Sequence, residues 1–220
     1  GVNPSITDSS TFTFMKTDKM KELFENEIEG CFLYSRHWSP SNKYLADALS
    51  KLEGTESAQV TSSGISAIVC TILQICKKGD KIISSRTIYG GTWAFFKNIL
   101  PRFGINVKFV EITNLTKVKN EINEKTKLIF CETISNPLLD VSNIPELSKI
   151  SKNNNLKLIV DNTFSPMLVS PYRIGADVVI HSLTKYINGA SDCVAGCICA
   201  SNEFINELTD INFGMTMLLG

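Results

Sequence analysis

Continuous apolar runs alternate with helical stretches along most of the chain, and this alternation restricts the folds that the sequence can adopt. Strand-like runs are predicted at residues 81–84, 107–112, 127–131, 156–160, 178–181 and 194–200. Helices are predicted between most of them, at residues 65–76, 92–100, 115–121 and 144–152. Two parallel neighbouring strands need a crossover connection, which is usually a helix. Strands that are covered on both faces of a sheet are apolar throughout. The sequence therefore predicts an α/β fold, a mostly parallel sheet with helices on both faces.

The N-terminal segment does not follow this alternation. Residues 1–38 are irregular apart from a short charged helix near residues 20–27, and we expect them to form an extended arm. A helix is then predicted from residue 42 or 43 to residue 52, with Gly54 placed to end it. The remaining residues, 39–220, are expected to form one ligand-binding domain.

The charge balance indicates a small-molecule ligand. Lys plus Arg and Asp plus Glu number 22 each, so the formal net charge is zero. Such a chain has no overall positive field to attract nucleic acid or an anionic membrane. It also shows no signal-peptide pattern and no apolar stretch long enough to span a bilayer. We therefore expect neither a nucleic-acid partner nor a membrane.

The seven cysteines predict a reducing, cytoplasmic location. Several lie in apolar runs, where a thiol behaves as a small buried hydrophobe. These are Cys70, Cys76, Cys131, Cys197 and Cys199. Cys193, Cys197 and Cys199 are spaced somewhat like metal ligands, but Cys197 and Cys199 would face the same side of a strand, and no histidine is close in sequence. We expect no metal site.

Two predicted strands end on residues that suit a pyridoxal phosphate site. The run 177–186 carries a strand into a lysine, Lys185, and the run 156–160 ends on Asp161. Pyridoxal phosphate chemistry needs a Schiff-base lysine to carry the aldehyde and a carboxylate to keep the pyridine nitrogen protonated. In parallel sheets ligands bind beyond the carboxyl ends of the strands, and Tyr89 is expected at the same edge.

A helix that opens on small residues supplies a candidate phosphate site. Ser63, Gly64 and Ile65 stand at the predicted start of the helix 65–76, where free backbone amides and the helix dipole favour phosphate. Ser182 and Thr184 add hydroxyl groups from the strand end that carries the lysine. Taken alone, Ser62 and Ser63 are more simply an ordinary helix cap.

Tyr89 precedes two glycines and follows a predicted strand. A tyrosine in this place can stack on a flat cofactor ring while the glycines let the backbone approach. The alternative is a tyrosine that closes a loop over the core. The sequence contains no GxGxxG or GxxxxGK[ST] motif, so dinucleotide and P-loop sites have no support.

These motifs resemble the pyridoxal-phosphate enzymes of cysteine and methionine metabolism, which include cystathionine lyases and synthases, homoserine sulfhydrylases and methionine γ-lyases. The resemblance covers essentially the whole chain. Its N-terminal segments are most similar to the plant-type methionine γ-lyases. The segments are Gly1-Val2-Asn3, Thr11-Phe12-Thr13-Phe14-Met15, Tyr34-Ser35-Arg36-His37 and Leu52-Glu53-Gly54-Thr55-Glu56. The resemblance implies the large domain of a fold-type I transferase.

The resemblance implies a role for each candidate around the cofactor ring. Lys185 would hold the aldehyde, and Asp161 would pair with the pyridine nitrogen. Tyr89 would stack on the ring and act near the reacting carbons. Asn136 would lie near the phenolic oxygen.

The phosphate would be held by two subunits. Ser63, Gly64, Ile65, Ser182 and Thr184 would contribute from one chain. Tyr34 and Arg36 would reach in from a neighbour, and an arginine fork suits phosphate. On the residues alone, an arginine beside an aromatic is more simply a solvated surface residue. The active unit would be at least a dimer, usually a dimer of dimers.

The implied reaction is α,γ-elimination of L-methionine to methanethiol, 2-oxobutanoate and ammonia. Activity on cystathionine as a γ- or β-lyase, or γ-replacement as a γ-synthase or O-acetylhomoserine sulfhydrylase, is the alternative. Bacterial methionine γ-lyases carry a cysteine where this chain has Gly91. Family chains also continue into a smaller C-terminal domain with an arginine for the substrate carboxylate, whereas this sequence ends at Gly220. A non-catalytic cofactor-binding or subunit-interaction fragment is therefore a second alternative.

Overall fold

The computed structural model describes residues 4–25, 30–210 and 214–215. Its first helix, α1 (Thr17–Glu25), begins earlier than the predicted helix near residues 20–27, whose last two residues lie outside the described part. Among the described residues, no helix combines the length and the apolar character needed to cross a membrane.

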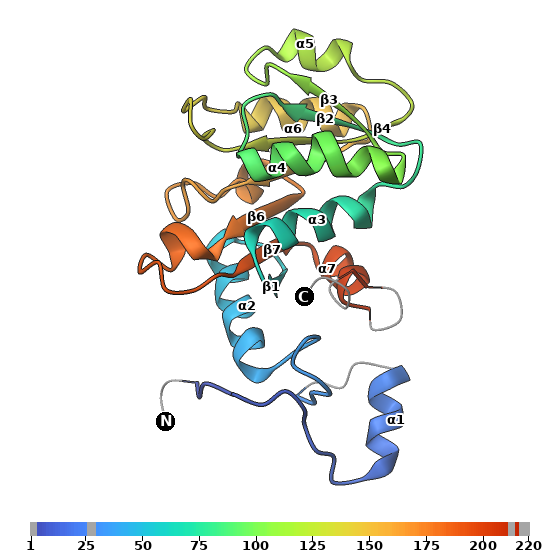
Figure 1. Cartoon of the computed structure of the whole chain (residues 1–220), viewed down its shortest axis with the longest axis vertical. Helices are drawn as coiled ribbons and strands as arrows, with labels where there is room; N and C mark the ends of the chain where they lie inside the picture. The colour runs from blue at the N-terminus through green and yellow to red at the C-terminus, as the bar shows by residue number, and fades with distance from the viewer. Residues whose placement is uncertain (1–3, 26–29, 211–213, 216–220) are drawn as a thin grey trace.

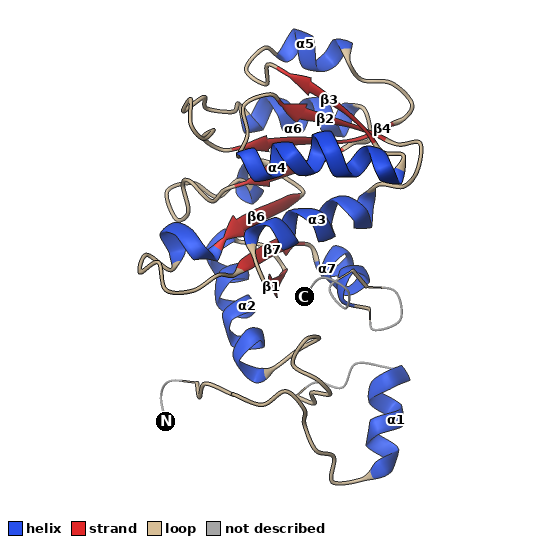
Figure 2. Ribbon diagram, viewed as in Figure 1, coloured by secondary structure: helices blue, strands red, loops and turns tan. Residues whose placement is uncertain are grey.

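Seven strands form a single sheet in the order β1-β7-β6-β5-β4-β2-β3. They are β1 (Ser57–Thr61), β2 (Lys81–Ser85), β3 (Asn106–Val110), β4 (Thr126–Glu132), β5 (Lys157–Asp161), β6 (Val178–Ser182) and β7 (Gly196–Ala200). β7 runs antiparallel to both of its neighbours, and every other pairing is parallel. Figure 2 shows the strands in this arrangement with the helices around them. The predicted mostly parallel sheet is confirmed.

Helices cover both faces of this sheet. They are α2 (Pro40–Glu53), α3 (Gly64–Ile75), α4 (Gly90–Ala94), α5 (Leu115–Asn120), α6 (Ile144–Asn153) and α7 (Asn202–Thr209). Short helical turns complete the set: η1 (Phe95–Ile99), η2 (Leu100–Phe103), η3 (Tyr172–Ile174) and η4 (Leu183–Ile187). α2 begins at Pro40 because the Ser39 hydroxyl accepts from Asn42 N, and it ends at Gly54 in the left-handed conformation, as expected.

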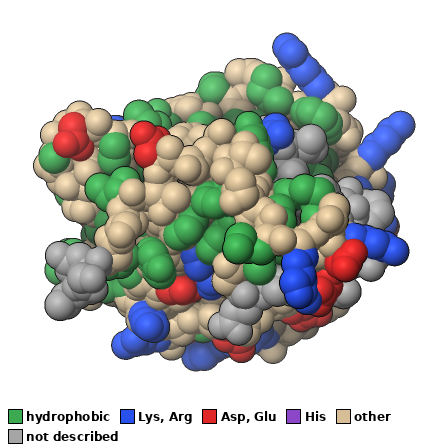
Figure 3. All heavy atoms as spheres, turned by 90° about the horizontal axis from the view of Figure 1, so that it is seen from below, with side chains coloured by type: hydrophobic (Ala, Val, Ile, Leu, Met, Phe, Trp, Pro, Cys, Tyr) green, Lys and Arg blue, Asp and Glu red, His purple; other side chains and the backbone are tan. Residues whose placement is uncertain are grey.

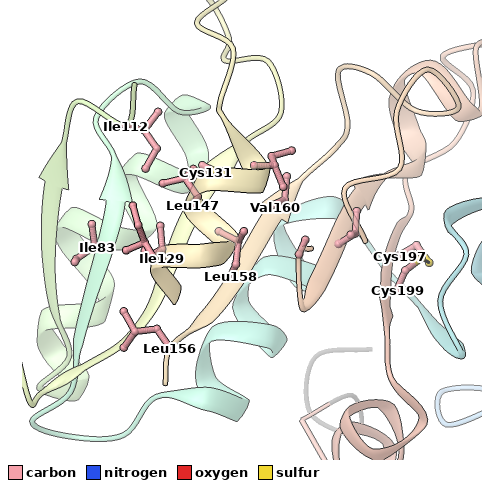
Figure 4. Packing of buried hydrophobic residues seen from close by; sticks show 14 of the residues in the cluster. Ile83, Ile112, Ile129, Cys131, Leu147, Leu156, Leu158, Val160, Cys197 and Cys199 are labelled. Carbon is pink, nitrogen blue, oxygen red and sulfur yellow. Dashed lines mark hydrogen bonds between the residues drawn. The ribbon is translucent and has the colours of Figure 1, made fainter. Parts of the chain in front are cut away.

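Two hydrophobic cores lie on opposite faces of the sheet. Side chains alternate along each strand, so Leu158 and Val160 of β5 join one core and Ile159 joins the other. The first core packs against α2, α5 and α6, and part of it is drawn in Figure 4. The second packs against α3, η1 and α7. The five cysteines expected in apolar runs are all buried.

The N-terminal arm extends away from the sheet. In Figure 1 it runs below the α/β body together with α1. A β-bridge between Thr11 and Tyr34 closes the arm on itself. Hydrogen bonds tie it to the body at two places: Thr7 N donates to Ser41 Oγ at 2.7 Å and that hydroxyl donates to Ser5 O at 3.4 Å, while His37 Nε2 lies 2.7 Å from Thr209 O. The path of the arm leaves much of its apolar surface uncovered by its own chain.

Candidate active site

A pocket of about 1090 Å³ opens where the strands β4, β5 and β6 end and where α3 begins. The loops that follow these three strands lie together on the left of Figure 1. Nine of the predicted site residues line this pocket. They are Ser63, Gly64, Ile65, Tyr89, Asn136, Asp161, Ser182, Thr184 and Lys185. The structure therefore brings together residues that are as far as 122 positions apart in the sequence, from Ser63 to Lys185.

Lys185 lies in η4, directly after β6. Its backbone, with φ −95° and ψ −115°, departs from helical geometry and interrupts the turn. The side chain is exposed and lines the pocket. Within the described part of the chain, no hydrogen bond or ion pair engages its Nζ. An amine in this position is available to a carbonyl group bound in the pocket.

Asp161 ends β5 and is fixed by a short polar network. Its Oδ1 accepts from Thr163 N at 2.9 Å, and Thr163 Oγ1 accepts from Ser182 N at 2.7 Å. Burial raises the pKa of Asp161 above its usual value, while the hydrogen bonds from Thr163 and the charge of His181 act in the opposite direction. A cationic group placed beside this carboxyl would favour its ionised form.

The start of α3 packs so closely against the end of β6 that residue 64 has no room for a side chain. A Cβ added at Gly64 would lie 2.6 Å from Ser182 Cβ. Ser63 caps the helix by accepting from Ser66 N at 3.0 Å, so the capping role considered for this serine is present. Because the approach is so close, the N-terminus of a 12-residue helix and the Ser182 hydroxyl face one corner of the pocket.

Thr184 has a structural contact that the sequence did not indicate. Its Oγ1 accepts from Ala195 N at 3.0 Å and donates to Ala195 O at 3.2 Å. The hydroxyl therefore joins η4 to the loop that leads into β7. A direct bond from this hydroxyl to phosphate stays a prediction, and it would need the donation to Ala195 to be redirected.

Tyr89 stands immediately before α4, and its side chain is 53% exposed. Its ring lies over Gly91, where a Cβ would come within 2.5 Å of Tyr89 Cε1. The ring keeps this position because residue 91 is glycine, so a cysteine here would force the tyrosine to move.

Glu132 is a site residue that the sequence analysis missed. It ends β4, opposite Asp161 in the register of β4 and β5, and lies in the pocket wall at 6% exposure. Its Oε1 accepts from Tyr89 N at 2.6 Å, and its Oε2 accepts from Asn136 N at 3.0 Å. The available signal was an acid at the end of an apolar strand, the same signal that identified Asp161.

Tyr34 and Arg36 do not line the pocket. They lie in the arm, where the Arg36 guanidinium sits 5.4 Å from the centroid of the Tyr34 ring. Tyr34 remains 40% exposed. The structure of one chain thus places this pair apart from the other nine candidates.

The cysteines predicted to share one side of a strand do so, because Cys197 Sγ and Cys199 Sγ are 3.6 Å apart in β7. Within the described residues, no group of three or more His, Cys, Asp or Glu side chains is arranged to hold a metal ion.

Comparison with known proteins identifies the family. The family model described as "Cys/Met metabolism PLP-dependent enzyme" matches residues 1–217. The chain belongs to this family. The cofactor predicted from the sequence, pyridoxal phosphate, is the one on which the family depends.

Individual relatives show how the chain compares in length. The methionine γ-lyase of Arabidopsis thaliana is 43% identical over 100% of this chain and 51% of its own length. The cystathionine γ-lyase of Dictyostelium discoideum is 39% identical over 77% of this chain and 44% of its own. The chain spans about half the length of these relatives.

A solved structure shares the fold. It is described as an O-acetylhomoserine (thiol)-lyase of Campylobacter jejuni and contains a pyridoxyl-lysine monophosphate. It superimposes with a TM-score of 0.88 at 28% identity, over 93% of this chain and 50% of its own length.

The residues present fit pyridoxal phosphate. The tight contact at Gly64 leaves a helix N-terminus facing the pocket, which suits a phosphate group. Lys185 offers an amine for the aldehyde, and Asp161 offers a carboxyl for the ring nitrogen.

The phosphate corner can be tested by adding one methyl group. Gly64→Ala forces α3 away from Ser182, and we expect roughly 10- to 100-fold weaker binding of pyridoxal phosphate in a spectroscopic titration. Gly90→Ala is the matched control, because Gly90 does not line the pocket and a Cβ there meets nothing within 4 Å. Its affinity should stay within about twofold of the unaltered chain. Unaltered affinity in a folded Gly64→Ala variant would contradict this account of the phosphate corner.

Proposed function

We propose that this chain forms the cofactor-binding part of a pyridoxal-phosphate-dependent carbon–sulfur lyase that performs α,γ-elimination on L-methionine. The products are methanethiol, 2-oxobutanoate and ammonia, with one water consumed. The observation that carries the proposal is the meeting of Lys185 and Asp161 in one pocket beside the start of α3. The identity to the methionine γ-lyase of Arabidopsis thaliana supports methionine as the substrate.

Each residue has a distinct task in this reaction. When bound, pyridoxal phosphate supplies an aldehyde for amines and a ring that accepts electrons. Asp161 would face the ring nitrogen of the bound cofactor and favour its protonated form. Lys185 would hold the cofactor aldehyde, and its amine would move protons at the α and β carbons of the amino acid. Tyr89 delivers a proton to the departing sulfur.

Activity on cystathionine or γ-replacement on an acylated homoserine would use the same residues. A cystathionine γ-lyase and an O-succinylhomoserine sulfhydrylase are both similar to this chain. The choice depends on the shape of the pocket wall and on whether water or a thiol meets the reacting γ carbon. The predicted cytoplasmic location stays a prediction for all of these activities.

Product analysis tests the reaction. We expect the purified chain with pyridoxal phosphate to release methanethiol from methionine faster than it forms product from cystathionine or from O-acetylhomoserine with sulfide. Lys185→Ala should lower the rate by a factor of about 10² to 10⁴ or more, since it removes the base. Lys149→Ala, which alters an exposed lysine of α6, should change nothing.

Each outcome of this assay has a clear meaning. Methanethiol release that survives Lys185→Ala would contradict the mechanism. Preference for cystathionine or O-acetylhomoserine would favour the alternative activities. Cofactor binding without any product would favour a non-catalytic cofactor-binding piece.

We infer that Tyr34 and Arg36 complete a neighbour's pocket in a homo-oligomer. The reason is that the cofactor phosphate needs more positive charge than one chain supplies. Lys185 is the only basic side chain among the described residues that line the pocket, whereas Glu132, Asp161 and Asp192 are acidic. One lysine beside three acidic side chains does not balance the two negative charges of a phosphate group.

The arm has the surface needed to reach a neighbour. Figure 3 views the molecule from below, the side on which the arm lies, and shows apolar side chains among basic and acidic ones. Ile6 of the arm is 93% exposed and Met15 is fully exposed. We infer that a neighbouring subunit covers these two side chains in the assembly. A dimer of dimers, as in the family resemblance, is our expectation for the complete assembly.

Co-expression of two defective variants tests the shared site. Arg36→Ala and Lys185→Ala should each lack sites that trap cofactor tightly, but a mixed dimer regains one intact site. Random pairing predicts that about one quarter of the tight sites return. Arg102→Ala, an exposed arginine outside the arm, should bind cofactor as the unaltered chain does. Full affinity in Arg36→Ala, or no recovery in the mixture, would contradict a site built by two subunits.

A further inference from the structure

Two loops that meet at the pocket are joined through one buried carboxylate. The first loop precedes α4 and carries Tyr89, and the second follows β4 and carries Asn136. Neither loop is part of the sheet, so the strand register alone does not fix their separation. Glu132 lies between them, and each of its two oxygens accepts from one backbone amide.

We propose that Glu132 is a positioning residue that holds Tyr89 and Asn136 at a fixed separation across the cofactor pocket. The proposal rests on the proposed function, because the two loops matter most when a flat cofactor lies between them. It assigns Glu132 no contact with substrate. The residue would act through the backbones that it binds.

The sheet makes Glu132 a rigid anchor. It is the last residue of β4, and its backbone oxygen accepts from Ser142 Oγ at 2.6 Å. The register of β4 and β5 sets it beside Asp161. At 6% exposure the side chain has little freedom to turn toward solvent. Movement of either loop would therefore leave one oxygen of a buried carboxylate without its hydrogen bond, which is costly.

Both hydrogen bonds are strongest when Glu132 is ionised, because protonation removes the charge and makes one carboxyl oxygen a donor and a poorer acceptor. Burial, followed by the charge of Asp161, raises the pKa of Glu132 to about 7, and the two amides oppose the increase. The pair of bonds is thus complete above neutral pH and weakens as pH falls through about 7. The other titratable groups in the pocket are Tyr89, Asp161, Lys185, Tyr186, Asp192 and Cys193.

Glu132→Gln tests the proposal with little change in volume. Its amide nitrogen must face one of the two backbone N–H donors, so one hydrogen bond is lost. Without cofactor, we expect the amides of Tyr89 and Asn136 to exchange hydrogen for deuterium about tenfold faster or more. The affinity for pyridoxal phosphate should fall by roughly tenfold.

Two further variants sharpen the test. Glu132→Asp keeps the charge but shortens the side chain, so it should protect only one of the two amides. Glu56→Gln is the matched control, because Glu56 also accepts from a backbone amide, Asn202 N at 2.9 Å, but it does not line the pocket. Exchange at Tyr89 and Asn136 and cofactor affinity should be unaltered in this control.

A measurement on the unaltered chain keeps the proposal open to refutation if both variants at residue 132 fail to fold. The amide NMR signals of Tyr89 and Asn136 should shift together as pH is varied, with a common midpoint near 7. Independent midpoints, no shift at either amide, or unchanged exchange in a folded Glu132→Gln variant would overturn the proposal. Failure of the unaltered chain to bind pyridoxal phosphate would instead contradict the proposed function, and the exchange result would still stand.

Discussion

The parallel register of β4, β5 and β6 is the constraint on which the rest of the site depends. It ends the three strands at one edge, so that Glu132 and Asp161 stand side by side and the chain leaves β6 directly into Lys185. Strands covered by helices on both faces cannot slip by one residue, because every side chain would exchange faces. The two hydrophobic cores fix the strand register, and the register fixes where the polar residues at the strand ends lie.

The close contact between α3 and β6 adds the second half of the site. Gly64 lets the helix N-terminus approach Ser182, which gives the pocket a corner suited to anions next to an edge that bears carboxylates. A cofactor with a phosphate at one end and a ring nitrogen at the other matches this separation of charge. The remaining phosphate charge is the physical reason to look for Arg36 from a second chain.

Site residues that end apolar runs could be predicted from the sequence. Residues whose role depends on contacts with distant segments could not. Asp161 and Lys185 follow strands that are apolar enough to recognise, and the sheet, its mostly parallel pairing and the pocket edge were predicted from them. β1 was missed because Ser57–Thr61 contains the polar Gln59, which is buried in the strand that pairs with β7. The eight-residue α7 was also missed.

Contacts between distant segments explain the other omissions. Thr163 and Glu132 act by binding backbone amides of residues that are 19 and 43 positions away, and local pattern carries no sign of such bonds. The contact of Thr184 with Ala195 depends on β7 returning antiparallel beside β6. The need for glycine at position 91 likewise follows only from the ring of Tyr89, which lies over it.

The central claim is that this pocket holds pyridoxal phosphate on Lys185. The most direct test is the visible absorption spectrum of the purified chain with the cofactor, followed by borohydride reduction and peptide mapping of the labelled lysine. The account predicts an absorption band typical of a lysine-bound cofactor and label confined to the peptide that contains Lys185. Absence of the band, or label spread over surface lysines, would contradict it.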